Sequence, residues 1–176
     1  MTPEEFYKKY IGKKVDADGA YKNQCVDSFI IFCKENNIPY FNTVTGWAGG
    51  LWTHRQDQYK KYFDLIYKKE NLKNGDWMVF TKPEHVAMYY NGLMFSQNQG
   101  GKNEAFDLRK INGTFLGAYR LKSYTTPNAK KDGDNLTLQE AYKTIANEVK
   151  KGRYGNGHEN RMKKIYEEIR KEVNRK

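Results

Sequence analysis

The stretch Asp16-Ala-Asp-Gly-Ala-Tyr-Lys-Asn-Gln-Cys-Val-Asp27 leads directly into the first strongly apolar segment of the chain, residues 24–34. Apolar residues recur in that segment with the period of a helix, at Val26, Phe29, Ile30 and Cys33. The stretch therefore predicts an acidic loop followed by a helix, with Cys25 in the first turn. The positive end of the helix dipole favours an anion there, so we expect a lowered pKa and an exposed thiolate.

The chain has 176 residues, enough for one substantial domain and a smaller unit. Its hydrophobic content is only 38%, but 14 Tyr, 9 Phe and 3 Trp supply bulk for a core. No stretch approaches the length of a transmembrane helix. The first residues lack the apolar region of a secretory signal, so we expect no signal peptide and a cytoplasmic location before any release.

The net charge of +10 is spread along the chain, and residues 123–176 carry 13 basic and 8 acidic side chains of the total. This balance favours polyanionic partners such as nucleic acid, an acidic membrane or an anionic cell wall. Basic stripes interleaved with aromatic residues are missing from the sequence, and so is any nucleic-acid-binding motif. The sequence therefore disfavours nucleic acid as the partner.

The chain contains two cysteines, Cys25 and Cys33, which do not form the pattern of a disulfide framework and suit a reducing compartment. Cys33 lies among apolar residues in the predicted helix, which indicates a small buried hydrophobe. Cys25 follows the polar run Lys-Asn-Gln, and we interpret it as a nucleophile. The alternative is a buried, inert thiol.

The pattern of apolar residues changes after residue 75. The helical spacing gives way to short segments rich in Val, Tyr and Phe. We predict strands at Asp76–Phe80, His85–Tyr90, Leu93–Gln97, Ala105–Leu108 and Phe115–Leu121. The pair Asn91-Gly92 between two of them predicts a β-hairpin. Helices at residues 3–10 and 24–34 precede these strands, so the expected fold class is α+β. Between the two regions, Trp47, Leu51 and Trp52 are expected to close the edge of the core.

The end of the chain is predicted to form a separate unit. Residues 123–135 contain almost no apolar side chain and predict a linker after a main domain of residues 1–122. In residues 136–176, Thr137 and Glu140 form a capping box at the start of an amphipathic helix, and a second helix follows a glycine-rich turn. Two such helices make a marginal core, so we expect them to dock on the main domain or to self-associate.

A thiol nucleophile needs a base, and the chain offers three histidines: His54, His85 and His158. His85 opens a predicted strand, and the next strand of the hairpin brings Ser96 and Asn98 alongside it on one face. The base must itself be oriented by an acceptor. Asn98 is the stronger candidate, because its amide oxygen can accept a hydrogen bond from the imidazole.

The acidic loop has the ligand spacing of a calcium site. Positions 1, 3, 5, 7 and 12 would use the carboxylates of Asp16, Asp18 and Asp27 and the backbone carbonyls of Ala20 and Lys22. The glycine stands at the fourth rather than the sixth position, and the last ligand is Asp rather than Glu, so the loop is not an ordinary EF-hand. The alternative is a solvated acidic turn in which Asp27 caps the helix.

These motifs together resemble one family of enzymes. The run D-x-D-G-x-Y-x-x-Q-C-x-D, Gly75-Asp76 before a strand, a His followed by apolar residues, and Gln-Asn before glycines are similar to the CHAP family. Its members are cysteine, histidine-dependent amidohydrolases/peptidases that cut peptidoglycan and are common in bacteriophage endolysins. The resemblance covers roughly residues 10–122. It implies a papain-like α+β fold, Cys25 as nucleophile and His85 as base.

The resemblance also bears on the accessory residues. Family members often carry a glutamate where this chain has Ser96, so the resemblance leaves Asn98 as the orienting residue. Gln24 is implied as an oxyanion donor by the same papain-like arrangement. Some CHAP endolysins bind calcium at the positions that match Asp16–Asp27. We therefore expect structural Ca²⁺ and no organic cofactor.

The second unit has a weaker likeness. Ile145-Ala-Asn-Glu-Val149, Gly152, Gly155-Asn-Gly157 and Arg161 resemble the short cell-wall-binding repeats at the ends of some phage lysozymes. On this reading the wall contacts would come from Arg153, Tyr154, Asn156 and Arg161. A further Gly-Tyr-Asp-Tyr stretch, usual in those repeats, is missing from the sequence. The alternative is a helical hairpin that packs on the catalytic domain or forms a homo-oligomer.

The leading hypothesis is an endolysin, a peptidoglycan hydrolase that uses Cys25 to cleave an amide bond in the walls of Gram-positive bacteria. It would act as an endopeptidase or as an N-acetylmuramoyl-L-alanine amidase. It would remain in the cytoplasm of the host bacterium until its release to the wall at host cell lysis. One alternative is a non-catalytic module that binds cell wall or other polyanions, and another is a cytosolic cysteine protease that acts on proteins.

Overall fold

The computed structural model describes residues 1–124. A division of the chain into two units falls between Asp132 and Gly133. The predicted linker from residue 125 onward, both predicted helices of residues 136–176 and the predicted wall-binding residues all lie outside the described residues. No helix among the described residues is long and apolar enough to cross a membrane.

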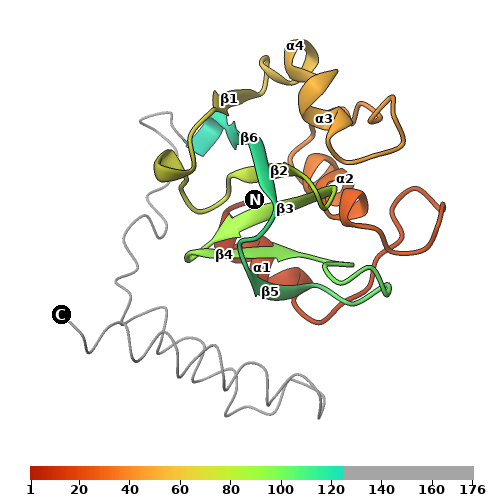
Figure 1. Cartoon of the computed structure of the whole chain (residues 1–176). Helices are drawn as coiled ribbons and strands as arrows, with labels where there is room; N and C mark the ends of the chain where they lie inside the picture. Colours follow the sequence, from red (N-terminus) through yellow and green to blue (C-terminus); the bar gives the residue numbers. More distant parts are fainter. Residues whose placement is uncertain (125–176) are drawn as a thin grey trace. The chain divides into compact units, whose positions relative to one another are not determined.

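The described residues form an α+β fold with an antiparallel sheet of six strands. Figure 1 shows how the helices and the sheet are arranged. Helices α1 and α2 precede the sheet, followed by two short helices; their bounds are Pro3–Tyr10, Cys25–Glu35, Gly50–Thr53 for α3 and Gln56–Tyr59 for α4. Strands β1 to β6 span Phe63–Ile66, Trp77–Thr81, His85–Tyr90, Leu93–Ser96, Asp107–Lys110 and Thr114–Leu121. In the sheet they stand in the order β1-β6-β2-β3-β4-β5. Two 3₁₀ turns, Lys69–Asn71 and Lys122–Tyr124, complete the described residues.

Helix α1 begins at a capping box. The Thr2 side chain accepts a hydrogen bond from the Glu5 backbone amide, and the Glu5 carboxylate accepts one from the Thr2 amide. Pro3 occupies the first turn, where its missing N–H costs nothing. The helix buries the aromatic residues on one face: Phe6, Tyr7 and Tyr10.

The core lies between helices α1 and α2 and one face of the sheet, around the fully buried Trp77. The Trp77 ring centroid lies 5.6 Å from that of Phe6, 5.2 Å from that of Phe29 and 5.0 Å from that of Phe32. Edge and tilted contacts of this kind stabilise a packed core beyond the area that they bury. A second apolar cluster contains Met78, Phe80, Ala87, Met94 and Ala118.

Strands β3 and β4 form the hairpin that the sequence predicts at Asn91-Gly92. Both turn residues have positive φ, 50° for Asn91 and 81° for Gly92, as a two-residue turn of this hand requires. The register pairs Tyr90 with Leu93 and Met88 with Phe95. The turn thereby determines which residues at the far end of β4 lie beside the start of β3.

Several predictions about the periphery of the domain are wrong. Strand β1 was not predicted, because its four residues are too few for an alternating pattern to stand out. Strand β5 lies two residues later than the predicted Ala105–Leu108. Leu51 and Trp52 are buried as expected, but Trp47 is 65% exposed. Its loop turns the indole outward, and Trp52 packs instead against Tyr119, with ring centroids 5.2 Å apart.

Candidate active site

Cys25 is the first residue of α2, as the sequence predicts. Its sulfur accepts hydrogen bonds from the backbone amides of Val86, Val26 and Cys25 itself. Val86 follows His85 in β3. The thiol therefore contacts the residue next to the predicted base. The structure thus brings together two residues that lie 60 positions apart in the chain, the predicted nucleophile and the predicted base.

The side chain of Gln97 holds the start of α2 in this place. Its Oε1 accepts a hydrogen bond from Val15 N at 3.0 Å, and its Nε2 donates to Val15 O at 2.6 Å and to Gln24 O at 2.9 Å. The Gln97 backbone amide donates to Ser28 Oγ at 3.3 Å. Gln97 is completely buried. One side chain therefore connects the end of β4 to both ends of the acidic loop that precedes Cys25.

Ser96 stands where the CHAP resemblance predicts a carboxylate. Its hydroxyl contacts both β3 and α2. Its hydroxyl donates to Val86 O at 2.9 Å and lies 3.0 Å from the hydroxyl of Ser28 in α2. Both serines are fully buried. A carboxylate at position 96 would meet the acceptor oxygen of Val86 in a buried environment, so the serine suits these neighbours.

The environment of Cys25 corrects the expectation of a thiolate. Burial raises the pKa of the Cys25 thiol to about 11, and the amide hydrogen bonds from Val86, Val26 and Cys25 lower it by less. The helix N-terminus does favour the anion, as predicted, but burial has the larger effect. At neutral pH the thiol of the free protein therefore carries its proton.

His85 is 8% exposed, so it is a buried histidine rather than a solvated one. Its Nε2 is buried and has no hydrogen-bond partner among residues 1–124. Burial lowers the pKa of His85 to about 4; Arg109 lowers it further, and Glu104 opposes the shift. At neutral pH the imidazole is therefore unprotonated, the form that can accept a proton from a thiol.

Asn98, the predicted orienting residue, has partners at both ends of its amide. Its Nδ2 donates to Gln24 Oε1 at 3.1 Å, and its Oδ1 accepts from Asn103 N at 2.8 Å. Gln24 Nε2 in turn donates to Tyr21 O at 2.7 Å and lies 3.4 Å from Asn103 Oδ1. In the structure, Asn98 and Gln24 orient each other beside Cys25. Their roles toward His85 and an oxyanion stay predictions.

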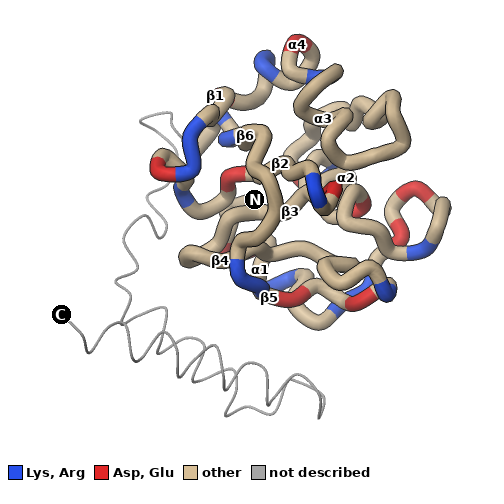
Figure 2. The backbone as a smooth tube through the Cα atoms, in the orientation of Figure 1, with Lys and Arg blue, Asp and Glu red and all other residues tan. Residues whose placement is uncertain are grey.

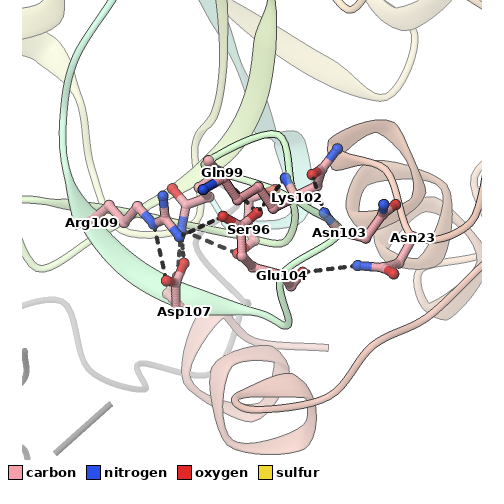
Figure 3. Close-up of polar contacts among 10 residues, drawn as sticks. Asn23, Ser96, Gln99, Lys102, Asn103, Glu104, Asp107 and Arg109 are labelled. Carbon is pink, nitrogen blue, oxygen red and sulfur yellow. Dashed lines mark hydrogen bonds and ion pairs between the residues drawn. The ribbon is translucent and has the colours of Figure 1, made fainter. Parts of the chain in front are cut away.

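Two charged residues of the site, Glu104 and Arg109, were not found from the sequence. Glu104 lies in the loop between β4 and β5, and its carbonyl accepts a hydrogen bond from Asn23 Nδ2 at 2.9 Å (Figure 3). Asn23 precedes Cys25 by two residues. The loop has a glycine-rich sequence without periodicity, so the sequence carries no signal for the position of its carboxylate.

The three predicted carboxylate ligands of the acidic loop lie together. Oxygen atoms of Asp16, Asp18 and Asp27 are all within 4.8 Å of one another. Figure 2 shows acidic residues, in red, in the loop that leads into α2. Asp16 and Asp18 each accept one backbone hydrogen bond within the loop, from Gly19 N at 2.8 Å and Ala20 N at 2.9 Å. Oxygen-only donors of this kind suit a hard cation such as Ca²⁺.

Asp27 also caps α2, as the alternative reading of the loop predicts. Its Oδ2 accepts from Gln24 N at 2.6 Å, and its Oδ1 accepts from Ala17 N at 2.9 Å. Burial raises the pKa of Asp27 above its ordinary value, the two backbone hydrogen bonds lower it, and the charges of Asp18 and Asp16 raise it. The three carboxylates repel one another, and a bound cation would reduce that repulsion.

The fold and the site define an α+β protein in which a cysteine at a helix N-terminus lies beside a strand that begins with a histidine. Comparison with curated proteins finds similarity to the D-alanyl-L-alanine endopeptidase of Streptococcus phage B30, with 34% identity over 155 residues. The alignment covers 79% of this chain and 34% of that protein, so the chain spans about a third of its relative's length. No known family model matches the chain, and no solved structure matches it.

The Gln97 contacts predict a large effect on stability. Replacement of Gln97 with Leu keeps a side chain of similar length but leaves the partly buried Val15 N, Val15 O and Gln24 O without this partner. We expect the free energy of unfolding to fall by about 1–3 kcal/mol, since several partly buried polar groups lose their hydrogen bonds. Urea unfolding of the full chain measures the change, with Gln56→Ala on α4 as a matched control. A loss below about 0.5 kcal/mol, the range of ordinary surface substitutions, would contradict this account.

Proposed function

We propose that the protein is a peptidoglycan hydrolase of the endolysin type, a CHAP-like cysteine endopeptidase that cleaves an amide bond of the bacterial cell wall. One observation carries the proposal: the Cys25 thiol lies at the Val86 amide, next to a buried, unprotonated His85. The similarity to a phage endopeptidase supports it. The net charge of +10 suits an anionic wall.

In the first step, the Cys25 sulfur attacks the carbonyl carbon of the scissile amide while its proton passes to His85. Because the pKa values leave both groups neutral at rest, proton transfer accompanies the attack and no preformed ion pair is required. The carbonyl electrons move to oxygen, and we propose that backbone N–H groups at the start of α2 stabilise that oxyanion. Gln24 can assist if its amide leaves Tyr21 O.

In the second half of the reaction, the tetrahedral intermediate collapses and the C–N bond breaks. The leaving amine takes the proton from the His85 imidazolium, which leaves an acyl-thioester on Cys25. Water then attacks the thioester and gives its proton to His85, and the thiolate leaves and recovers that proton. The products are a free amine and a carboxylate, with the protein returned to its starting state.

The choice between the two candidate bonds follows from the relative. Its name describes an endopeptidase acting on a D-alanyl-L-alanine bond. We therefore favour cleavage of a peptide bond between wall peptides over cleavage of the sugar–peptide amide. Mass spectrometry of digested walls separates the two, because an endopeptidase releases a new amino-terminal alanine and an amidase releases free glycan.

Replacement of Cys25 with Ala tests the proposal directly. We expect the rate of new amine release from Gram-positive cell walls to fall by at least about 10⁴-fold, because the nucleophile is lost. Cys33→Ala is the matched control, since Cys33 is a buried thiol in the last turn of α2, away from its N-terminus, and the substitution should leave the rate unchanged. Equal amine release by the Cys25 variant would reject the mechanism. Wall binding without amine release by the wild type would instead favour the non-catalytic binding module.

The environment of His85 predicts an unusual pH dependence. Its imidazole accepts a proton only when unprotonated, and its pKa is lowered from 6.5 to about 4. Activity of the free protein should therefore persist below pH 6 and decline only as the pH falls through about 4. The acid limb of kcat/KM on a soluble cross-linked wall peptide measures this. His54→Gln should not move the limb, and a wild-type limb near 6.5 would contradict the buried, neutral base.

We further propose that the acidic loop binds one structural Ca²⁺ through the carboxylates of Asp16, Asp18 and Asp27, which lie close enough to share a cation. The backbone carbonyls of Ala20 and Lys22 are the proposed additional ligands. A bound cation would neutralise the repulsion in the loop and hold it against the start of α2. It would take no direct part in the amide chemistry.

Removal of calcium provides the test. We expect chelation by EDTA to lower the Tm of the full chain and excess CaCl₂ to restore it, because a ligand that binds only the folded state stabilises it. Asp18→Asn should lower the Tm in calcium and abolish the response to the chelator. Asp57→Asn, in an exposed ion pair with Lys60, is the charge-matched control. An identical Tm in EDTA and in CaCl₂ would remove calcium from the proposal.

A further inference from the structure

Exposed large hydrophobic side chains gather in the two loops that adjoin the proposed catalytic residues. Residues 1–124 contain four of them: Trp47 and Tyr67, each 65% exposed, Val44 at 59% and Tyr21 at 88%. Val44 and Trp47 share the loop before α3, and Tyr21 lies in the acidic loop before Cys25. Figure 1 shows both loops projecting on the same side of the domain. Single exposed hydrophobic residues are common, but a group of them beside reactive side chains indicates a binding surface.

The backbone around Trp47 is held in place although its side chain is exposed. Trp47 N donates a hydrogen bond to Thr45 Oγ1 at 3.2 Å, and Trp47 O accepts one from Gly50 N at 3.0 Å. At the start of the loop, Arg55 donates to the backbone oxygen of Asn42 at 2.7 Å and to its side-chain oxygen at 2.8 Å. A loop that is already ordered loses little conformational entropy when a ligand binds to it. Tryptophan on such a support is a frequent anchor residue in binding sites.

A carboxylate connects this loop to the residue before His85. Glu84 Oε2 accepts a hydrogen bond from Gly49 N at 2.5 Å, and Glu84 Oε1 accepts one from the Thr81 hydroxyl at 3.2 Å. A Cβ atom at position 49 would lie 2.7 Å from Glu84 Oε2, so glycine leaves the space that the carboxylate fills. Glu84 directly precedes His85, the first residue of β3. The loop that carries Trp47 is therefore attached next to the proposed base.

The attachment beside His85 indicates which part of the substrate meets the loop. In the proposed reaction His85 gives its proton to the leaving amine, so the nitrogen of the scissile bond has to come within hydrogen-bond reach of the imidazole. The peptide that carries this amine starts at that point. Trp47 is two residues from Gly49, at most about 8 Å between α-carbons, and an extended peptide advances about 3.4 Å per residue. A leaving peptide of a few residues is thus long enough to lie along the loop.

The acidic loop is connected to the other member of the catalytic pair. The Tyr21 carbonyl accepts a hydrogen bond from Gln24 Nε2 at 2.7 Å, and Gln24 directly precedes Cys25. In the proposed reaction Cys25 forms its bond to the acyl part of the substrate. The two loops with exposed aromatic residues thus adjoin different halves of the substrate, the acyl half at Cys25 and the amine half at His85.

We propose that Trp47 is a specificity-determining residue that binds the amine-side peptide of the cell-wall substrate, and that Glu84 is the positioning residue for its loop. The inference rests on the proposed function and names the half of the substrate that this loop recognises. The indole supplies a flat, rigid apolar surface for the alanine methyl group and the backbone of the leaving peptide. The contact ends when the amine departs, so it acts on formation of the acyl-thioester and not on its hydrolysis.

Two soluble substrates separate the two halves. One is a cross-linked wall peptide, and the other is the methyl ester of its acyl half, whose leaving group is too short to reach Trp47. For each, kcat/KM reports the stabilisation of the transition state relative to the free protein and substrate. We expect Trp47→Ala to lower the ratio of kcat/KM for the cross-linked peptide to kcat/KM for the ester by at least about tenfold. Trp47→Phe keeps an aromatic ring and should recover part of the ratio.

The positioning role of Glu84 has its own readout. Glu84→Ala removes the acceptor of Gly49 N and should lower the same ratio. Combined with Trp47→Ala, it should lower the ratio by less than the product of the two single effects, because both substitutions act through one loop. Equal losses on the two substrates would instead place the effect of Glu84 on His85 and reject its role toward the loop.

Tyr67→Ala is the matched control, because Tyr67 has the same exposure and follows the edge strand β1. Its ratio should equal that of the wild type. Both rates come from one protein sample, so partial unfolding of a variant cancels in the ratio. An unchanged ratio in Trp47→Ala overturns the inference. A loss that appears only on intact walls, and not on the sugar-free peptide, overturns it as well.

The inference and the proposed function fail in distinguishable ways. Binding of the cross-linked peptide to Cys25→Ala protein needs no catalysis, and the NMR signal of the Trp47 indole N–H reports it. If the wild type releases no amine but the peptide shifts this signal, the proposed function fails and the assignment of Trp47 as a peptide-binding residue stands. If amine release depends on Cys25 but Trp47→Ala keeps the wild-type ratio, the function stands and the assignment of Trp47 is rejected.

Discussion

The buried amide of Gln97 is the contact on which the arrangement of the site depends. It joins Val15, before the acidic loop, to Gln24, at the loop's end, and both partners lie more than 70 residues away in the chain. Because both ends of the loop are held by the same side chain, the start of α2, and with it Cys25, has a fixed position relative to β4. The hydrogen bonds are partly buried, and Gln97 itself is completely buried, so its amide would be costly to leave without partners.

Burial also determines the chemistry of the two central residues. The helix N-terminus and the Val86 amide favour a Cys25 thiolate, but withdrawal of the sulfur from water outweighs them. The same effect keeps His85 unprotonated. The resting pair is therefore neutral, and the energy of charge separation has to be supplied as the reaction proceeds.

The elements that the sequence predicts well are those that depend on local signals. Helices α1 and α2 follow from the 3.6-residue period and from Pro3 at the first turn, and the β3–β4 hairpin follows from Asn91-Gly92. The four-residue β1 carries too little pattern and is recognisable only by its pairing with β6. Trp47 shows the opposite failure, since hydrophobicity predicts burial but the side chain is exposed to solvent.

The sequence by itself determined the acidic spacing of Asp16, Asp18 and Asp27, the place of Cys25 at the start of its helix and the place of His85 at the start of a strand. All of these depend on neighbours within a few residues. Only the tertiary structure decided the partners that are distant in the chain. Asn98 donates a hydrogen bond to Gln24, and the charges of Arg109 and Glu104 act on the pKa of His85. Buried polar groups compete for every donor and acceptor within reach, and the outcome depends on distances that close only when the sheet and helices are packed.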